Sequence, residues 1–81
     1  MARKPPHSIR YTVQFKLSDG TITELLHYET MQMIGYAIER RDAVEALIWN
    51  GEHTDVTGMA VSRRATRGPR GGLVVEKLVR E

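Results

Sequence analysis

The chain contains no cysteine among its 81 residues. This absence excludes disulfides, thiolate metal sites and cysteine nucleophiles together. Small secreted domains usually depend on disulfides, so we expect a cytoplasmic protein. No stretch approaches the roughly 20 apolar residues that a membrane-spanning helix needs, and the basic N-terminus has no apolar segment behind it. The sequence therefore predicts neither a membrane anchor nor a signal peptide.

Residues in catalytic or metal-binding spacing are also lacking. The three histidines, His7, His27 and His53, are far apart and form no i, i+4 pair of the kind that binds zinc on a helix. No serine stands in a G-x-S-x-G nucleophile elbow. The glycine-rich segment lacks the strand-to-helix setting of a phosphate-binding loop. We therefore expect no enzymatic activity, no cofactor and no metal site.

The length of the chain favours one domain with one small core. A chain of this size buries roughly 60% of its unfolded surface, which leaves a thin stability margin. Both dimerisation and docking onto a larger partner would add stability, and both stay open at this stage. Residues 1–8 are expected to form a flexible arm, because Pro5-Pro6 cannot join a strand ladder, and residues 9–81 to form the domain.

Two strands are expected before residue 30. Apolar and polar residues alternate over residues 9–17, which is typical of a half-buried strand. The sequence SDGT follows, and its Asp19-Gly20 pair favours a two-residue turn in which both residues tolerate positive φ. A second strand is expected over residues 21–28, so that the two strands form a hairpin.

Residues 30–50 show the periodicity of an amphipathic helix. Thr30 is a suitable N-cap, and Asn50-Gly51 is a suitable C-terminal stop. One wide arc collects the apolar residues Met33, Ile34, Ala37, Ile38, Val44, Leu47 and Ile48. Arg40 and Arg41 interrupt that arc, so an alternative with two shorter helices and a bend near residues 40–42 stays open.

Strand-like residues return over 56–64 and 73–80, on either side of the segment RRATRGPRGG at residues 63–72. Its glycines and proline are typical of a flexible hairpin loop. The order of elements is then β-β-α-β-β. The predicted fold is α+β, a four-stranded antiparallel sheet with one helix packed on one face.

Charge is segregated along the chain, although the formal net charge is only +2. Counting Lys and Arg against Asp and Glu, residues 1–16 carry +4, residues 17–62 carry −6 and residues 63–81 carry +4. On a small domain this pattern can build one positive and one negative surface.

Two surfaces are therefore candidates for partner binding. The loop arginines could follow a nucleic-acid backbone or bind an acidic protein, and they are Arg63, Arg64, Arg67 and Arg70. The opposite candidate is a row of carboxylates that would occupy a cationic groove in place of phosphates, namely Glu39, Asp42, Glu45, Glu52 and Asp55. An aromatic stacking platform for RNA is not expected, because Tyr11, Phe15 and Tyr28 face the helix and Trp49 and Tyr36 are assigned to it. The other sheet face would then expose polar residues such as Arg10, Thr12, Gln14 and His27.

In architecture and charge, this short cysteine-free β-β-α-β-β domain resembles the small accessory proteins of bacteriophages and mobile elements, including anti-CRISPR proteins. The resemblance implies a stoichiometric, non-enzymatic inhibitor that docks on a host protein or nucleoprotein complex. The alternative is a small nucleic-acid-binding protein that uses the basic hairpin loop.

Overall fold

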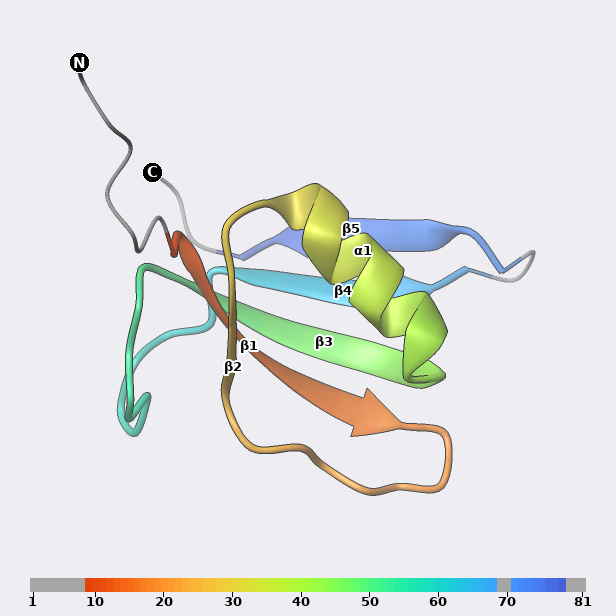
Figure 1. Ribbon diagram of the computed structural model, residues 1–81, viewed down its shortest axis with the longest axis horizontal. Coiled ribbons are helices and arrows are strands. Elements are labelled where there is room, and N and C mark those ends of the chain that lie inside the picture. The colour runs from red at the N-terminus through yellow and green to blue at the C-terminus, as the bar shows by residue number, and fades with distance from the viewer. Residues whose placement is uncertain (1–8, 69–70, 79–81) are drawn as a thin grey trace, which may run out of the picture.

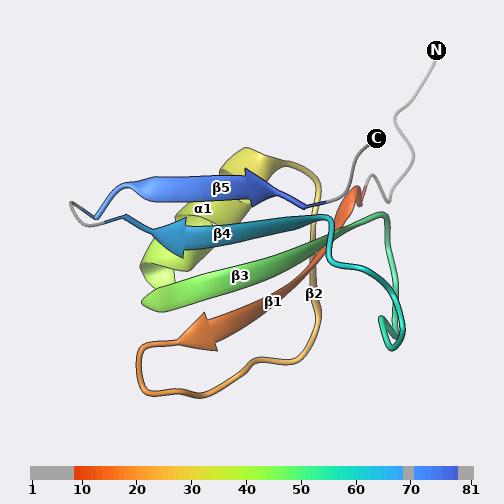
Figure 2. The same cartoon turned by 180° about the vertical axis from the view of Figure 1, so that it is seen from behind.

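The computed structural model describes residues 9–68 and 71–78, so the arm expected at residues 1–8 lies outside the described residues. Within them the elements are β1 (Tyr11–Leu17), β2 (Leu26–Tyr28), α1 (Met31–Arg40), β3 (Ala43–Asn50), β4 (Arg63–Arg67) and β5 (Leu73–Lys77). The strands form one antiparallel sheet in the order β2-β1-β3-β4-β5. The helix crosses one face of this sheet (Figures 1 and 2). The α+β class is confirmed. The expected number of four strands is wrong, because part of the expected helix is a fifth strand.

The first two strands form the expected hairpin with a different turn. Residues 11–13 of β1 pair with Leu26–Tyr28, and before β2 only Ile22 bridges β1. The backbone N–H of Gly20 donates to Leu17 O (2.9 Å), and that of Leu17 donates to Thr21 O (2.8 Å). These bonds close a three-residue loop in which Gly20 alone has a positive φ, 91°. The expected two-residue turn is therefore wrong, since this loop length needs one left-handed residue, and glycine adopts that conformation at no steric cost.

Helix α1 begins where the sequence predicts but ends at Arg40 rather than at residue 50. Thr30 is extended, and its Oγ1 accepts a hydrogen bond of 3.1 Å from the backbone N–H of Met33, as expected of an N-cap. Asp42 then adopts a φ of 54°, in the left-handed region that aspartate tolerates better than most residues. This residue turns the chain back into β3. The continuous helix over residues 30–50 is wrong, and so is a second helix after a bend.

Replacing Thr30 with alanine is expected to lower the free energy of unfolding by about 1 kcal/mol, because the N–H of Met33 loses its side-chain acceptor. Urea denaturation followed by circular dichroism measures this change. Thr30→Ser keeps the hydroxyl and is the matched control, expected to stay close to the parent. Equal losses in the two variants would contradict the capping role of the hydroxyl.

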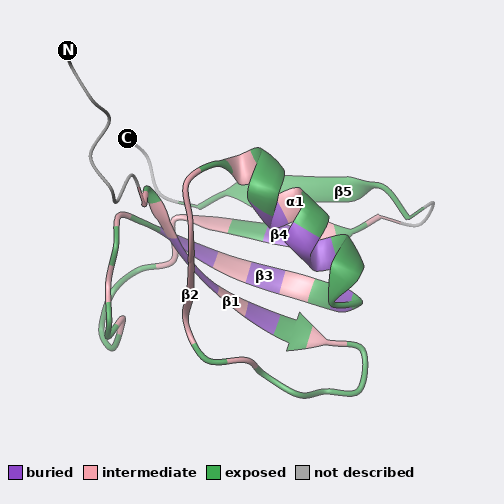
Figure 3. Ribbon diagram, in the orientation of Figure 1, coloured by how far each residue is buried: buried purple, intermediate pink, exposed green. Residues whose placement is uncertain are grey.

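Strand β3 is the central strand and carries much of the core. It pairs with β1 on one side and with β4 on the other. Ala43, Ala46 and Ile48 are fully buried on the face that α1 covers. Figure 3 shows buried residues along β1, β3 and the inner side of α1. The core cluster consists of Val13, Phe15, Ile34, Ala37, Ile38, Ala43, Ala46, Ile48 and Ala65.

Residues 51–62 form a loop, so the strand expected over 56–64 is wrong over most of its length. The backbone N–H of Met59 donates to Val56 O (2.9 Å) around Gly58, whose φ is 80°. A turn with positive φ interrupts the extended backbone there. β4 therefore begins only at Arg63, and β5 lies within the strand expected over 73–80.

This loop covers one end of the sheet face that lies opposite α1. Thr12 was expected on an exposed polar face, but it is fully buried. Its Oγ1 donates to Gly51 O (2.7 Å) and accepts from the backbone N–H of His53 (2.9 Å). Trp49, expected on the helix, pairs with Thr12 across β3 and β1 and is only 5% exposed. Its Nε1 donates to Met59 O (3.4 Å). The expected exposure of Thr12 is wrong because the loop supplies its partners.

Candidate functional site

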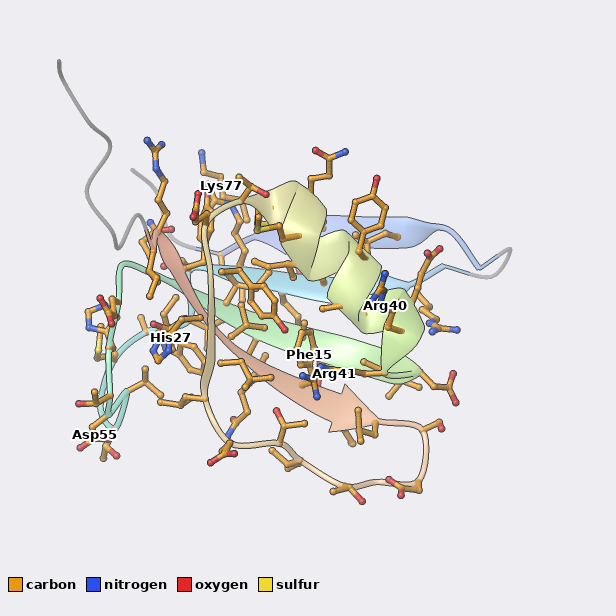
Figure 4. The ribbon with its side chains drawn as sticks, in the orientation of Figure 1. Phe15, His27, Arg40, Arg41, Asp55 and Lys77 are labelled. Carbon is orange, nitrogen blue, oxygen red and sulfur yellow. The ribbon has the colours of Figure 1, made fainter. Side chains whose placement is uncertain are left out.

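The five acidic residues of the expected row lie at two ends of the sheet. Glu39 lies in the last turn of α1, Asp42 forms the turn into β3, and Glu45 lies near the start of β3. Glu52 and Asp55 follow the end of β3. The eight residues of β3 span about 25 Å at the usual rise of a strand. Figure 4 shows Asp55 in the loop at the end of the sheet opposite the C-terminus of α1. The expectation that these carboxylates project from one helix and the loop after it is wrong.

Two of these carboxylates are ion-paired with arginines of β4. Asp42 Oδ1 lies 3.5 Å from Arg67 Nη2, and its Oδ2 accepts a hydrogen bond of 2.7 Å from the hydroxyl of Ser18. Glu45 is ion-paired with Nε of Arg64. Such exposed pairs usually contribute less than about 1 kcal/mol each. They nevertheless neutralise charge that both predicted surfaces would need.

Asp55 stabilises a turn of the 51–62 loop. Its Oδ1 accepts hydrogen bonds from the hydroxyl (2.7 Å) and the backbone N–H (3.0 Å) of Thr57. The hydroxyl first, and the N–H second, lower the pKa of Asp55 below its usual value. Thr21 lowers the pKa of Asp19 in the same way in the β1–β2 loop. Both carboxylates act as acceptors within their own loops.

Three of the four arginines assigned to a flexible loop lie in strand β4, and Arg70 lies outside the described residues. Strand alternation places Arg63 and Arg67 on the face of α1 and Arg64 on the opposite face. β4 ends at Arg67, and β5 begins at Leu73. The expectation that Arg63, Arg64 and Arg67 lie together in a flexible hairpin loop is wrong, because β4 contains them and directs them to different faces of the sheet.

The two arginines on the face of α1 also contact neighbouring elements. Arg63 Nη1 donates to Asn50 Oδ1 (2.9 Å), and its guanidinium lies 5.6 Å from the centroid of the Tyr11 ring. Arg67 Nη2 donates to Ile38 O near the end of α1 (3.4 Å). These contacts tie β4 to β1, β3 and α1 and engage the arginines inside the fold.

The histidines take structural roles. His27 Nε2 lies 2.8 Å from His53 O, and His53 Nε2 lies 2.7 Å from Asn50 O. His7 lies outside the described residues. Across residues 9–68 and 71–78, no group of three or more metal-ligating side chains lies close enough to hold an ion.

A different set of side chains forms the strongest candidate site. Met33 and Tyr36 are 45% and 58% exposed on α1, although both are large and apolar. Together with Ala37 they line a hollow of about 430 Å³ whose other walls are Tyr28, Arg40 and Arg41. We call Tyr28, Met33, Tyr36, Arg40 and Arg41 the arginine–tyrosine patch.

Helical periodicity places the α1 side chains of this patch next to one another. Met33, Tyr36 and Arg40 are separated by three and four residues, so they lie along one side of α1, next to the buried side that carries Ile34 and Ile38. The phenol oxygen of Tyr36 accepts a hydrogen bond of 3.3 Å from Gln32 Nε2 one turn earlier. The patch is therefore built on a capped, regular element.

The C-terminus of α1 places two cations beside these aromatic side chains. The guanidinium of Arg41 lies 5.7 Å from the centroid of the Phe15 ring, and Figure 4 shows it beside Phe15. Arg40 and Arg41 are both exposed, and neither forms an ion pair with another described residue. Cations at this position also complement the negative end of the helix dipole. The patch thus combines positive charge with exposed apolar surface.

Sequence reasoning did not select the arginine–tyrosine patch. The available signal was the position of Arg40 and Arg41 inside the apolar arc of the expected helix. In the structure these residues mark the end of α1, where the chain leaves the core and the arginines reach solvent.

No protein-family model matches the chain, and comparisons with curated proteins and with solved structures find no match. Among the described residues, no helix is long and apolar enough to cross a membrane.

Proposed function

We propose that this chain is a stoichiometric binding protein that docks on an acidic surface of a larger protein through the arginine–tyrosine patch. The observation that carries the proposal is the exposure of Met33 and Tyr36 beside two arginines without ion-pair partners in the described chain. Tyrosine, methionine and arginine are enriched at protein interfaces, and tyrosine and arginine supply many of the residues that dominate binding energy.

The charge of the patch selects an acidic partner. An acidic segment would pair with Arg40 and Arg41 while an apolar side chain of the partner fills the hollow between Met33 and Tyr36. The aromatic ring supplies contact area at a low cost in conformational entropy. Binding would therefore be specific in position and would weaken as salt increases.

Nucleic acid is the second candidate, favoured by the same combination of two arginines and two tyrosines. Continuous contact with phosphates usually involves a longer series of cations. Arg64 and Arg67 are ion-paired with carboxylates within the chain. These contacts favour a protein over a phosphate backbone as the principal ligand.

The finer proposal is the class of the target. We propose a small accessory protein of a bacteriophage or mobile element that acts in the cytoplasm and inhibits a host defence nucleoprotein complex, as anti-CRISPR proteins do. Its support is the sequence-level resemblance in size, architecture and segregated charge. In that setting the patch would occupy an acidic docking surface on a protein subunit of the complex.

Two substitutions within the arginine–tyrosine patch test the docking surface. Arg40→Glu is expected to weaken binding of a fluorescently labelled glutamate-rich peptide with one tryptophan by at least about tenfold, because it reverses a charge inside the patch. Tyr36→Ala is expected to weaken it by roughly thirtyfold if Tyr36 is the aromatic anchor. Fluorescence anisotropy across a salt series measures both effects.

Arg10→Glu is the matched control, because Arg10 is also exposed and the change in net charge is the same. Equal losses for Arg10→Glu and Arg40→Glu would contradict a defined patch. If the parent protein bound a labelled oligonucleotide more tightly than the peptide, and Arg40→Glu abolished that binding, the second candidate would be supported instead. The target class is tested in cells that carry CRISPR interference. The parent protein is expected to protect an incoming plasmid there, and Tyr36→Ala is expected to lose this protection.

A further inference from the structure

Strand β5 forms one edge of the sheet and exposes apolar side chains on both faces. Leu73, Val74 and Val75 are 42%, 52% and 44% exposed. Leu73 and Val75 point to the face of α1, where Leu73 approaches Gly35 of the helix, and Val74 points to the opposite face. An exposed apolar edge strand is a ready template for pairing with another strand.

The hydrogen-bond ladder shows which backbone groups of β5 are directed outward. Gly72 O accepts from the N–H of Gly68 (2.6 Å), and the N–H of Leu78 donates to Ser62 O (2.8 Å). These bonds bracket β5, so the even-numbered residues direct their N–H and C=O groups toward β4. Leu73 and Val75 direct theirs away from the sheet. A further strand would find a regular series of donors and acceptors there.

The other edge strand, β2, offers much less. It consists of three residues, whereas β5 has five. Short edge strands and charged edge residues are common protections against pairing. Within β5 the charged residues are confined to Glu76 and Lys77 at one end, so its first three residues lack that protection.

We propose that β5 pairs antiparallel with β5 of a second copy of this chain, about a two-fold axis through Val74. In this register Val74 lies opposite Val74 of the second copy, and Leu73 lies opposite Val75. The charged Glu76 and Lys77 then lie opposite Gly72 and Gly71, whose lack of side chains leaves room for them. Each Leu73–Val75 pair exchanges two backbone hydrogen bonds, because both residues direct their polar groups outward.

This self-complementarity is what favours a second copy over a foreign strand. Each apolar side chain of β5 meets an apolar side chain, and no two like charges are opposed. A two-fold axis through Val75 is less favourable, because it would place Val74 opposite Glu76 and Leu73 opposite Lys77. The small core of an 81-residue chain also gains from shared apolar burial.

The dimer goes beyond the proposed docking function and has a geometric consequence for it. Identical residues that pair across an antiparallel ladder point to the same face, so the two-fold axis stands perpendicular to the sheet. Both copies of α1 would lie on one face of a continuous ten-stranded sheet. The arginine–tyrosine patches of the two copies would then be presented on the same side, which allows bivalent binding.

Mass measurement tests the dimer without reference to any target. Sedimentation equilibrium of the purified full-length chain, up to millimolar concentration, is expected to show a species of twice the 9.2 kDa chain mass. Val74→Lys places two ammonium groups opposite each other and is expected to yield monomers that remain folded, because Val74 is half exposed in the single chain. Val44→Lys changes another exposed valine, at the β1–β3 bulge, and is the matched control, expected to remain dimeric.

Cysteine cross-linking tests the register against a background free of native thiols. Val74 pairs with its own copy at a site without hydrogen bonds, where Cα atoms are about 4.5 Å apart, within the range of a disulfide. Val74→Cys is therefore expected to form a covalent dimer under mild oxidation. Val75→Cys is expected to form none, because its diagonal separation of about 7–8 Å is too long.

Three results would overturn the proposal. The first is a monomer at every concentration. The second is a dimer that survives Val74→Lys. The third is cross-linking of Val75→Cys in preference to Val74→Cys. Loss of peptide binding in Arg40→Glu would affect the docking function alone, because Arg40 lies at the C-terminal end of α1 and does not line the hollow that α1 shares with Gly71, Gly72 and Leu73.

Discussion

Replacing Val13 with aspartate is expected to abolish cooperative folding at neutral pH. Val13 is fully buried in β1, where Leu26 of β2 and Ile48 of β3 are its cross-strand partners. Aspartate is smaller than valine by about one methyl group, so the cavity it leaves is small and the buried charge dominates the expected loss. An unpaired carboxylate in an apolar core costs several kcal/mol, whereas a domain of this size has a stability of roughly 5 kcal/mol.

The measurement is a thermal melt followed by circular dichroism and by the fluorescence of Trp49, the sole tryptophan. Gln14→Asp is the matched control, because the neighbouring side chain points to the opposite face of β1 and is partly exposed. It is expected to melt close to the parent. A Val13→Asp protein that melted like the parent would show that the register of β1 is wrong.

The first half of the fold follows from local sequence patterns. Strict alternation along β1 places Val13 and Phe15 on one face, and both are fully buried. The threonine at position 30 marks the start of α1 as an N-cap. In these segments local propensity and tertiary packing agree, so the sequence alone predicts the element.

Strand β3 could not be predicted in this way because its sequence is compatible with both structures. Alanine, glutamate and leucine favour a helix, whereas Val44, Ile48 and Trp49 favour a strand. The decision comes from pairing with β1 and β4, which are distant in sequence. In the structure, Asp42 adopts a left-handed conformation after Arg41, and this residue marks the end of α1.

The error at β3 explains the errors in the candidate sites. Once residues 43–50 are extended, Glu45 moves to a sheet face and Asp55 to the far end of the strand. Starting β4 at Arg63 likewise converts loop arginines into strand residues with partners such as Glu45. The charge pattern along the sequence does not show which charges remain unpaired, because contacts between distant segments decide this.

The packing of the 51–62 loop on the sheet depends on Trp49, and Trp49→Ala is expected to lower the free energy of unfolding by about 3–5 kcal/mol. Trp49 is 5% exposed although it lies on the face without α1. Removing the indole opens a cavity beneath the loop and removes the hydrogen bond to Met59 O (3.4 Å). Urea denaturation followed by circular dichroism measures the loss, since this variant has no tryptophan.

Limited proteolysis distinguishes local from global destabilisation. Trp49→Ala is expected to be cleaved within residues 51–62 well before the rest of the chain, because Thr12 anchors only the first part of the loop, at Gly51 and His53. Trp49→Phe retains most of the apolar contact and loses the indole N–H, so we expect a cost of about 1 kcal/mol and near-parental cleavage. A loss of less than about 1 kcal/mol in the free energy of unfolding of Trp49→Ala, with a loop still resistant to protease, would contradict this role of Trp49. Thr12 would then be sufficient to hold the loop on the sheet.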